Sequence, residues 1–189
     1  MHRRQFLSLS ALAAIAVPAQ EAIAMYSPFQ QQQPLSTLIV KPEEAQVYNM
    51  FGGGNARLLV TGEKSDGGWW MGRFREDPGF MTTYHYHPHT DEQVYVIEGV
   101  LSVYAENQWH ELGPGTLGVL PKGKPHAQGN RSSKPVDFIG SGAPAGFDKL
   151  FPAVDALMKR IKPGTPEFMA EFQKILPTCD IVPLGPAPK

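Results

Sequence analysis

The sequence predicts an all-β fold, a sandwich or barrel of short strands, followed by two α-helices. Between residues 36 and 140, short stretches rich in β-branched and aromatic residues recur at regular intervals, with Gly, Pro, Asp and Asn between them. After residue 146, apolar residues recur every three or four positions, which indicates helices. A length of 189 residues suits one globular domain with short extensions.

The net charge and the distribution of basic residues limit the kinds of molecule that the protein is expected to bind. The formal net charge is −1, and no run of Lys or Arg persists beyond the N-terminus. This composition gives no support for a nucleic-acid groove or a basic membrane-binding surface, so we expect a small-molecule partner. The one cysteine, Cys179, excludes an intrachain disulfide and a cysteine-based zinc site.

The first 24 residues have the character of a signal peptide. The pair Arg3-Arg4 precedes a mostly apolar stretch, Leu7 to Val17, which is too short to span a bilayer, and small residues surround position 24. This segment resembles a twin-arginine export signal. It predicts a periplasmic protein without a stable membrane anchor. The alternatives are an ordinary secretory signal, or a cytoplasmic protein translated from Met25.

The rest of the chain divides into three parts. Residues 25–35 contain a run of glutamines and are predicted to be a flexible leader. Residues 36–145 carry the strand patterns, and residues 146–189 form the C-terminal helices and tail. We expect the strands at 36–41, 57–61, 68–75, 81–87, 92–97, 100–105, 108–112, 116–120, from 126 onward, and at 135–140.

The strand predicted at 68–75 carries large side chains on both faces. Trp70, Gly72 and Phe74 share one face, and Trp69 lies on the other. One of these faces should line the interior. Its aromatic residues either form ordinary core or make a wall for a flat substrate, and the sequence leaves both interpretations open.

Two helices are expected at the C-terminal end, over 147–161 and 165–176. Pro152 either kinks the first helix or marks its first turn. Thr165 followed by proline is typical of a helix start. We expect these helices to pack on the exterior of the β-domain or on a second copy in a homodimer. Residues 183–189 are predicted to be a loose tail.

Polar residues near the middle of the chain suggest a metal site. His85 and His87 are two apart, so in a strand they share a face with their Cα atoms about 6.5 to 7 Å apart. Glu92 opens the next strand, which returns beside them, and His126 begins a strand after a Pro/Gly-rich turn. His89 is a further histidine, with three interpretations: a loop residue, a group supporting the ligands, or an alternative ligand.

Two long motifs resemble the paired motifs of the cupin superfamily. The first has Gly, five residues, His-x-His, four residues, Glu, six residues and Gly, from Gly79 to Gly99. The second has Gly, five residues, Pro-x-Gly, two residues, His, three residues and Asn, from Gly115 to Asn130. The resemblance implies a jelly-roll β-barrel that binds one divalent metal through His85, His87, Glu92 and His126. The alternative is a cupin that has lost its metal, in which these four residues are buried polar side chains that hydrogen-bond within the protein.

Three imidazoles and one carboxylate suit iron, manganese, nickel, cobalt, copper or zinc, and residue type does not choose among them. Four protein ligands on an octahedral ion leave open positions for substrate, water or dioxygen. Glu92 therefore has two predicted roles: it holds the metal, or it takes a proton from a substrate hydroxyl as general base.

Within the superfamily, the chain most resembles single-domain quercetin dioxygenase-like proteins. The likeness rests on residues 60–63 (Val-Thr-Gly-Glu), 67–69 (Gly-Gly-Trp) and 143–147 (Ala-Pro-Ala-Gly-Phe). It implies a metal-dependent dioxygenase that acts with dioxygen on a small enolic or aromatic, flavonol-like substrate. The alternatives are a non-redox cupin isomerase, decarboxylase or lyase, and a periplasmic ligand-binding cupin without turnover, because fold alone does not determine chemistry.

Overall fold

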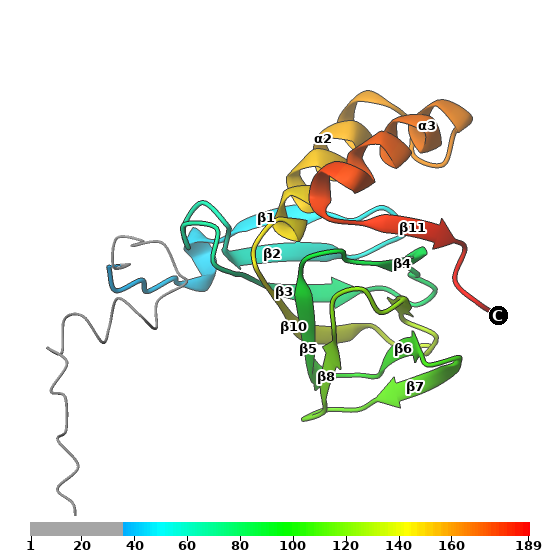
Figure 1. Ribbon diagram of the computed structural model, residues 1–189, viewed down its shortest axis with the longest axis horizontal. Helices are drawn as coiled ribbons and strands as arrows, with labels where there is room; N and C mark the ends of the chain where they lie inside the picture. Colours follow the sequence, from blue (N-terminus) through cyan, green and yellow to red (C-terminus); the bar gives the residue numbers. More distant parts are fainter. Residues whose placement is uncertain (1–35) are drawn as a thin grey trace, which may run out of the picture. The chain divides into compact units, whose positions relative to one another are not determined.

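A computed structural model describes residues 36–189 of the protein. These residues form two antiparallel β-sheets packed face to face, with two helices grouped at one end (Figure 1). The predicted signal peptide, residues 1–24, and the leader, residues 25–35, lie outside the described residues and stay predictions. Within the described part of the chain, no helix is both long and apolar enough to cross a membrane.

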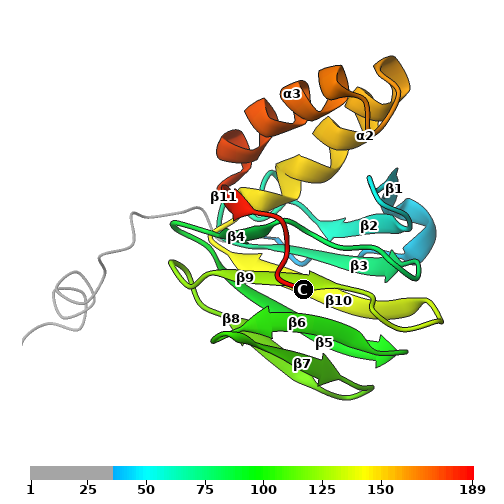
Figure 2. The same ribbon diagram turned by 90° about the vertical axis from the view of Figure 1, so that its right-hand side faces the viewer.

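The larger sheet has six strands and the smaller has five. The order in the larger sheet is β1 (Gln46–Asn49), β2 (Asn55–Val60), β3 (Trp70–Glu76), β10 (Val136–Ala143), β5 (Asp91–Glu98) and β8 (Leu117–Leu120). The order in the smaller sheet is β11 (Val182–Gly185), β4 (Tyr84–Tyr86), β9 (His126–Gly129), β6 (Leu101–Ala105) and β7 (Gln108–Leu112). The two sheets face each other in Figure 2. This architecture confirms the predicted all-β jelly roll with C-terminal helices.

The main core lies between the two sheets and follows the two-residue alternation of the strands. Trp70 and Phe74 of β3 are buried, whereas Trp69 is 37% exposed, so the face of Trp70, Gly72 and Phe74 is the inner one. The ring of Phe74 stacks on that of Phe138 in β10, with the ring centroids 5.3 Å apart. The aromatic face predicted from the sequence therefore lines the interior.

The C-terminal helices form where the apolar periodicity places them. A 3-10 helix, η2 (Phe147–Lys149), leads into α2 (Leu150–Arg160), and α3 (Pro166–Ile175) is followed by the 3-10 helix η3 (Leu176–Cys179). The Thr165 hydroxyl caps α3 by accepting a hydrogen bond from the Phe168 N–H. Pro152 lies in the first turn of α2, where a missing N–H removes no intrahelical hydrogen bond.

Three expectations about strand positions are wrong. Residues 36–41 form no strand, because the chain first turns through the 3-10 helix η1 (Pro42–Glu44) and begins its sheet at Gln46. The strand predicted over 81–87 covers only residues 84–86, with a single bridge from Met81 to Gly129 before it. Residues 183–185 of the predicted loose tail belong to β11 (Val182–Gly185), which adds to the edge of the smaller sheet beside β4. A proline is tolerated at such an edge.

Candidate metal centre

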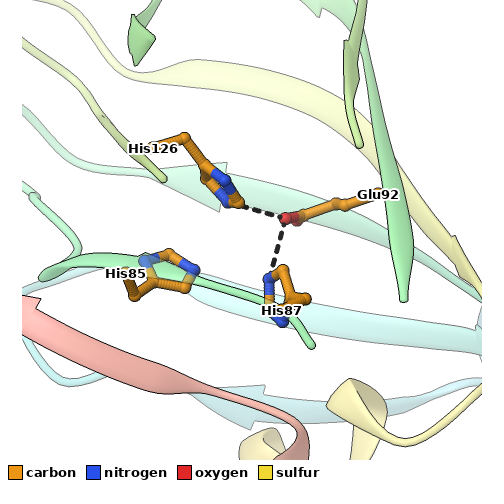
Figure 3. A group of neighbouring side chains, drawn as sticks. All are labelled: His85, His87, Glu92 and His126. Carbon is orange, nitrogen blue, oxygen red and sulfur yellow. Dashed lines mark hydrogen bonds and ion pairs between the residues drawn. The ribbon is translucent and has the colours of Figure 1, made fainter. Parts of the chain in front are cut away.

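Four polar side chains meet between the two sheets (Figure 3). His85 lies in β4 directly opposite His126 in β9, His87 follows β4, and Glu92 comes from β5 in the other sheet. All four are buried, and their ligand atoms lie within 4.8 Å of one another. Two atoms bonded at about 2.1 Å on opposite sides of one ion would be about 4.2 Å apart, so the most distant pair would have to approach by up to about 0.6 Å when an ion binds. The structure therefore brings together all four predicted ligands at a spacing compatible with one divalent metal.

Backbone carbonyls orient the three imidazoles. The Nδ1 atoms of His85, His87 and His126 lie 2.7, 2.8 and 3.0 Å from the carbonyl oxygens of Thr83, Asp180 and Lys124. Because a carbonyl only accepts, each Nδ1 carries the hydrogen, and in a neutral ring the lone pair is on Nε2. This arrangement is the usual one for metal-binding histidines, whose second ring nitrogen is held by a hydrogen bond.

The cluster requires a positive charge at its centre. Glu92 Oε2 lies 3.2 Å from His87 Nε2 and 3.3 Å from His126 Nε2. With Nδ1 protonated in each ring, these contacts would set a lone pair against a carboxylate unless a proton or a cation lies between them. His126 Nε2 is buried and makes no well-aligned hydrogen bond within the described residues. These donor atoms fit a divalent metal.

The pKa values follow the same geometry. Burial alone would raise the pKa of Glu92, but the imidazoles of His126 and His87 lower it below its usual value. Burial alone would lower the pKa of His87, yet the adjacent Glu92 carboxylate raises it. Burial, His126 and His87 together lower the pKa of His85 to about 3. The cluster therefore holds an ionised carboxylate and a neutral His85 ready to accept a cation.

His89 lies outside the cluster. Its side chain is 79% exposed, and its Nδ1 pairs with Asp180 Oδ1 at 2.7 Å. Of the three interpretations of this residue, the loop position is the one the structure supports. The other Asp180 oxygen accepts hydrogen bonds from the N–H groups of His89 and Thr90. Asp180 thus holds the turn after β4 and, through its carbonyl, the His87 ring.

Replacing Asp180 with alanine keeps the carbonyl that binds His87 but removes the carboxylate that holds the turn after β4. The carbonyl then loses its fixed position, so metal affinity is expected to fall by up to about 10-fold, the lower end of the effect of losing a group that orients a ligand. Asp180 has a left-handed backbone, with φ 58°, which Asn tolerates better than other residues. Asp180→Asn should therefore retain most of the affinity. Chelator competition measures both variants, and wild-type affinity in Asp180→Ala would contradict the assigned role.

An apolar cavity of about 150 Å³ adjoins the cluster. His85 and Glu92 form part of its wall, and most of the remaining wall is aromatic or aliphatic. Met169 and Phe172 of α3 also line it, so the C-terminal helices form part of the cavity wall in addition to packing on the β-domain. A second hollow, of about 460 Å³, touches His126 alone among the four ligands. The first cavity is the better candidate for a substrate because it touches two ligands.

Two polar residues of the cavity wall have no assignment from the sequence. Glu76, the last residue of β3, is 1% exposed, and its Oε2 has no hydrogen-bond partner within the described residues. Its Oε1 accepts a weak 3.4 Å hydrogen bond from the Gln128 amide. Burial raises the pKa of Glu76 to about 8, so the carboxyl is protonated at neutral pH. The one sequence signal for the burial of Glu76 is the two-residue alternation of β3, which puts residue 76 on the same inner face as Trp70 and Phe74.

Glu76 makes stability depend on pH. The folded protein retains a proton that the unfolded chain loses near pH 4.5, so Glu76 destabilises the fold increasingly from pH 4.5 up to about pH 8. Glu76→Gln removes this effect. We expect the free energy of unfolding of this variant to exceed that of the wild type by a difference that grows with rising pH. The difference should grow by up to about 1.4 kcal/mol per pH unit between pH 4.5 and about pH 8 and be constant above that range. Denaturant titrations at several pH values measure it, and a pH-independent difference would contradict it.

Comparison with known proteins agrees with this fold. Residues 72–140 match the family model described as Cupin domain. KdgF from Halomonas sp. has a TM-score of 0.53 at 19% identity, over 60% of this chain and 99% of that one. No curated protein matches the sequence.

Two further solved structures have lower TM-scores. A sugar phosphate isomerase of the cupin superfamily from Silicibacter pomeroyi has a TM-score of 0.49 at 22% identity, over 58% of this chain and 77% of that one. The polyketide cyclase RemF from Streptomyces resistomycificus has a TM-score of 0.49 at 19% identity, over 57% of this chain and 80% of that one.

Proposed function

Given a cupin fold with a buried cluster of three histidines and one glutamate, we propose that the protein is a metal-dependent enzyme that uses dioxygen to oxidise a small enolic or phenolic substrate. The observation that carries the proposal is the apolar cavity against His85 and Glu92. It offers an aromatic-lined space for a flat, uncharged molecule with one edge at the metal ligands.

Each residue of the cluster has a defined role in this proposal. His85, His87 and His126 would hold the ion through Nε2, with Glu92 as the fourth ligand. The ion would supply Lewis acidity towards a substrate oxygen. Glu92 is the one carboxylate of the cluster, and as general base it would accept the proton of the substrate hydroxyl at a carboxylate oxygen. The largely apolar wall around these residues would reduce the contact of the reacting oxygen with water.

The cavity size narrows the substrate. An apolar cavity of about 150 Å³ accommodates a molecule the size of benzene. A single-ring enol or phenol therefore matches the volume of the cavity, whereas a three-ring flavonol would extend beyond it. We accordingly propose a smaller substrate than the flavonols that the family resemblance implied.

A non-redox isomerase, decarboxylase or lyase is the second candidate. The protonated Glu76 carboxyl favours it, because an acid and the base Glu92 on the wall of one cavity suit a reaction that moves protons. In that case the same ligand set would act without dioxygen.

An oxygen electrode separates the candidates. The metal-loaded protein is incubated with a panel of single-ring enols and phenols, and oxygen consumption is recorded alongside product formation. Oxygen consumption coupled to product supports the dioxygenase. Equal product formation without oxygen would rule it out in favour of the non-redox enzyme, and metal-dependent binding without any product would indicate a ligand-binding cupin. Elemental analysis of the isolated protein identifies the native metal.

Export to the periplasm and a homodimer remain proposals. N-terminal sequencing of protein recovered from the periplasm tests export. A sequence that begins near Met25 would support it. For the dimer, the outer face of β5 and β8 carries exposed apolar residues, with Tyr95 and Leu117 paired across the two strands. Light scattering of the purified protein tests the oligomeric state.

A further inference from the structure

We propose that Glu76, together with Gln128, binds a second oxygen of the substrate, so that the substrate is a single ring with one oxygen at the metal ligands and another at this pair. The inference rests on the proposed function for the position of the first oxygen. It makes Glu76 a specificity-determining residue on the wall of the cavity that His85 and Glu92 also line.

The two side chains face each other across the interior. Glu76 is on the inner face of β3 in the larger sheet, and Gln128 is on β9 in the smaller sheet, two residues from His126 and on the same face of the strand. Both line the cavity that also touches His85 and Glu92. The pair therefore lines the same cavity as two of the proposed metal ligands.

Both side chains have hydrogen-bonding capacity to spare. Glu76 Oε2 and Gln128 Oε1 are buried, and neither has a hydrogen-bond partner within the described residues. A buried polar atom without a partner costs free energy, so it is normally satisfied by water or by a ligand. The surrounding cavity wall is largely apolar, which leaves a bound molecule as the natural partner for this pair.

The chemistry of the pair selects a hydroxyl or carbonyl group. Burial keeps the Glu76 carboxyl protonated at neutral pH, so its O–H can donate to a ligand oxygen, while the Gln128 oxygen can accept from a ligand O–H. A hydroxyl group satisfies both at once. A charged group is disfavoured, because an anion would gain no positive partner here and a cation would have to leave water for an apolar wall.

Ligand binding tests this inference without turnover. The full chain is loaded with Zn²⁺, which has no redox chemistry, and calorimetry compares phenol with resorcinol and hydroquinone. The two hydroxyls of each diol are too far apart to bind one ion together, so a preference for a diol reports a second contact. We expect at least one diol to bind about tenfold more tightly than phenol, the value of one hydrogen bond. Equal binding of all three, or no binding of any, would overturn the proposal.

Variants locate the second contact. Glu76→Leu should reduce the preference for the diol to less than about twofold, while Glu76→Gln, which still donates and accepts, should keep part of it. Glu98→Leu, at an exposed position on β5, is the matched control and should keep all of it. Circular dichroism confirms that each variant is folded. An unchanged preference in Glu76→Leu, or an equal loss in Glu98→Leu, would overturn the assignment.

This result is separable from the proposed function. If the protein consumes oxygen in a metal-dependent way but shows no preference for a diol, the assignment of Glu76 fails and the proposed function stands. If the preference depends on Glu76 but no substrate is turned over, the pair binds ligand and the enzymatic function fails.

Discussion

Replacing His126 with alanine is expected to abolish metal retention, because it removes one of three imidazoles whose Nε2 atoms converge on a single point. The loss should exceed the 10- to 100-fold change in affinity that usually follows removal of a group that only orients a ligand. His85→Ala and His87→Ala should behave in the same way. Metal content after dialysis, measured by elemental analysis against protein concentration, gives the result directly.

His89→Ala is the matched control. It removes a histidine two residues from His87, but the side chain is largely exposed and contacts Asp180 instead of the cluster. This variant should retain most of its metal. If His89→Ala lost the metal while His126→Ala kept it, the ligand assignment would be wrong.

Glu92→Gln is expected to lower turnover by about 10²- to 10⁴-fold, the usual contribution of a general base. The substitution keeps the size of the side chain but removes its charge and basicity. It also removes the carboxylate that faces His87 and His126, so metal affinity should fall as well. Activity must therefore be measured at saturating metal, where the loss of the base is separated from the loss of the ion.

Glu98→Gln provides the comparison for that measurement. Glu98 ends the same strand, β5, but lies exposed on its surface, so this variant should keep wild-type turnover and metal content. Full turnover of Glu92→Gln at saturating metal would remove Glu92 from the role of base and leave it as a ligand only.

The clustering of His85, His87, Glu92 and His126 could be predicted from the sequence because the motif residues determine local geometry. The four motif glycines Gly79, Gly99, Gly115 and Gly123 have φ values from +73° to +87°, which side chains rarely adopt, so each marks a turn that fixes where a strand begins or ends. Asn130, the last motif residue, is fully buried and donates to the carbonyls of Glu76 and Lys134. It ties the end of β9 to β3 and is not a ligand.

The polar pair on the cavity wall, Glu76 and Gln128, could not be predicted in this way. Glu76 and Gln128 come from different sheets, so their proximity depends on how the sheets pack and not on any spacing along the chain. The same holds for Asp180, whose contacts with His87 and His89 join residues about ninety positions apart. A lone carboxylate at the end of a strand gives no local signal of such a contact.

The positions of two strands were also predicted wrongly, again because they depend on contacts between distant parts of the chain. Residues 36–41 have β-forming side chains but no neighbouring strand to pair with, while residues 182–185 contain a proline and still pair because the edge beside β4 is open. Pairing partners decide both cases. The helices were easier to predict, because their hydrogen bonds are local and Thr165 marks the start of α3.

The central claim is that His85, His87, His126 and Glu92 together bind one metal ion inside the β-domain. X-ray absorption spectroscopy of the metal-loaded protein tests it most directly. Three imidazole nitrogens and at least one carboxylate oxygen at about 2.0 to 2.2 Å are predicted. A spectrum without imidazole scattering, or with a sulfur ligand, would contradict the account.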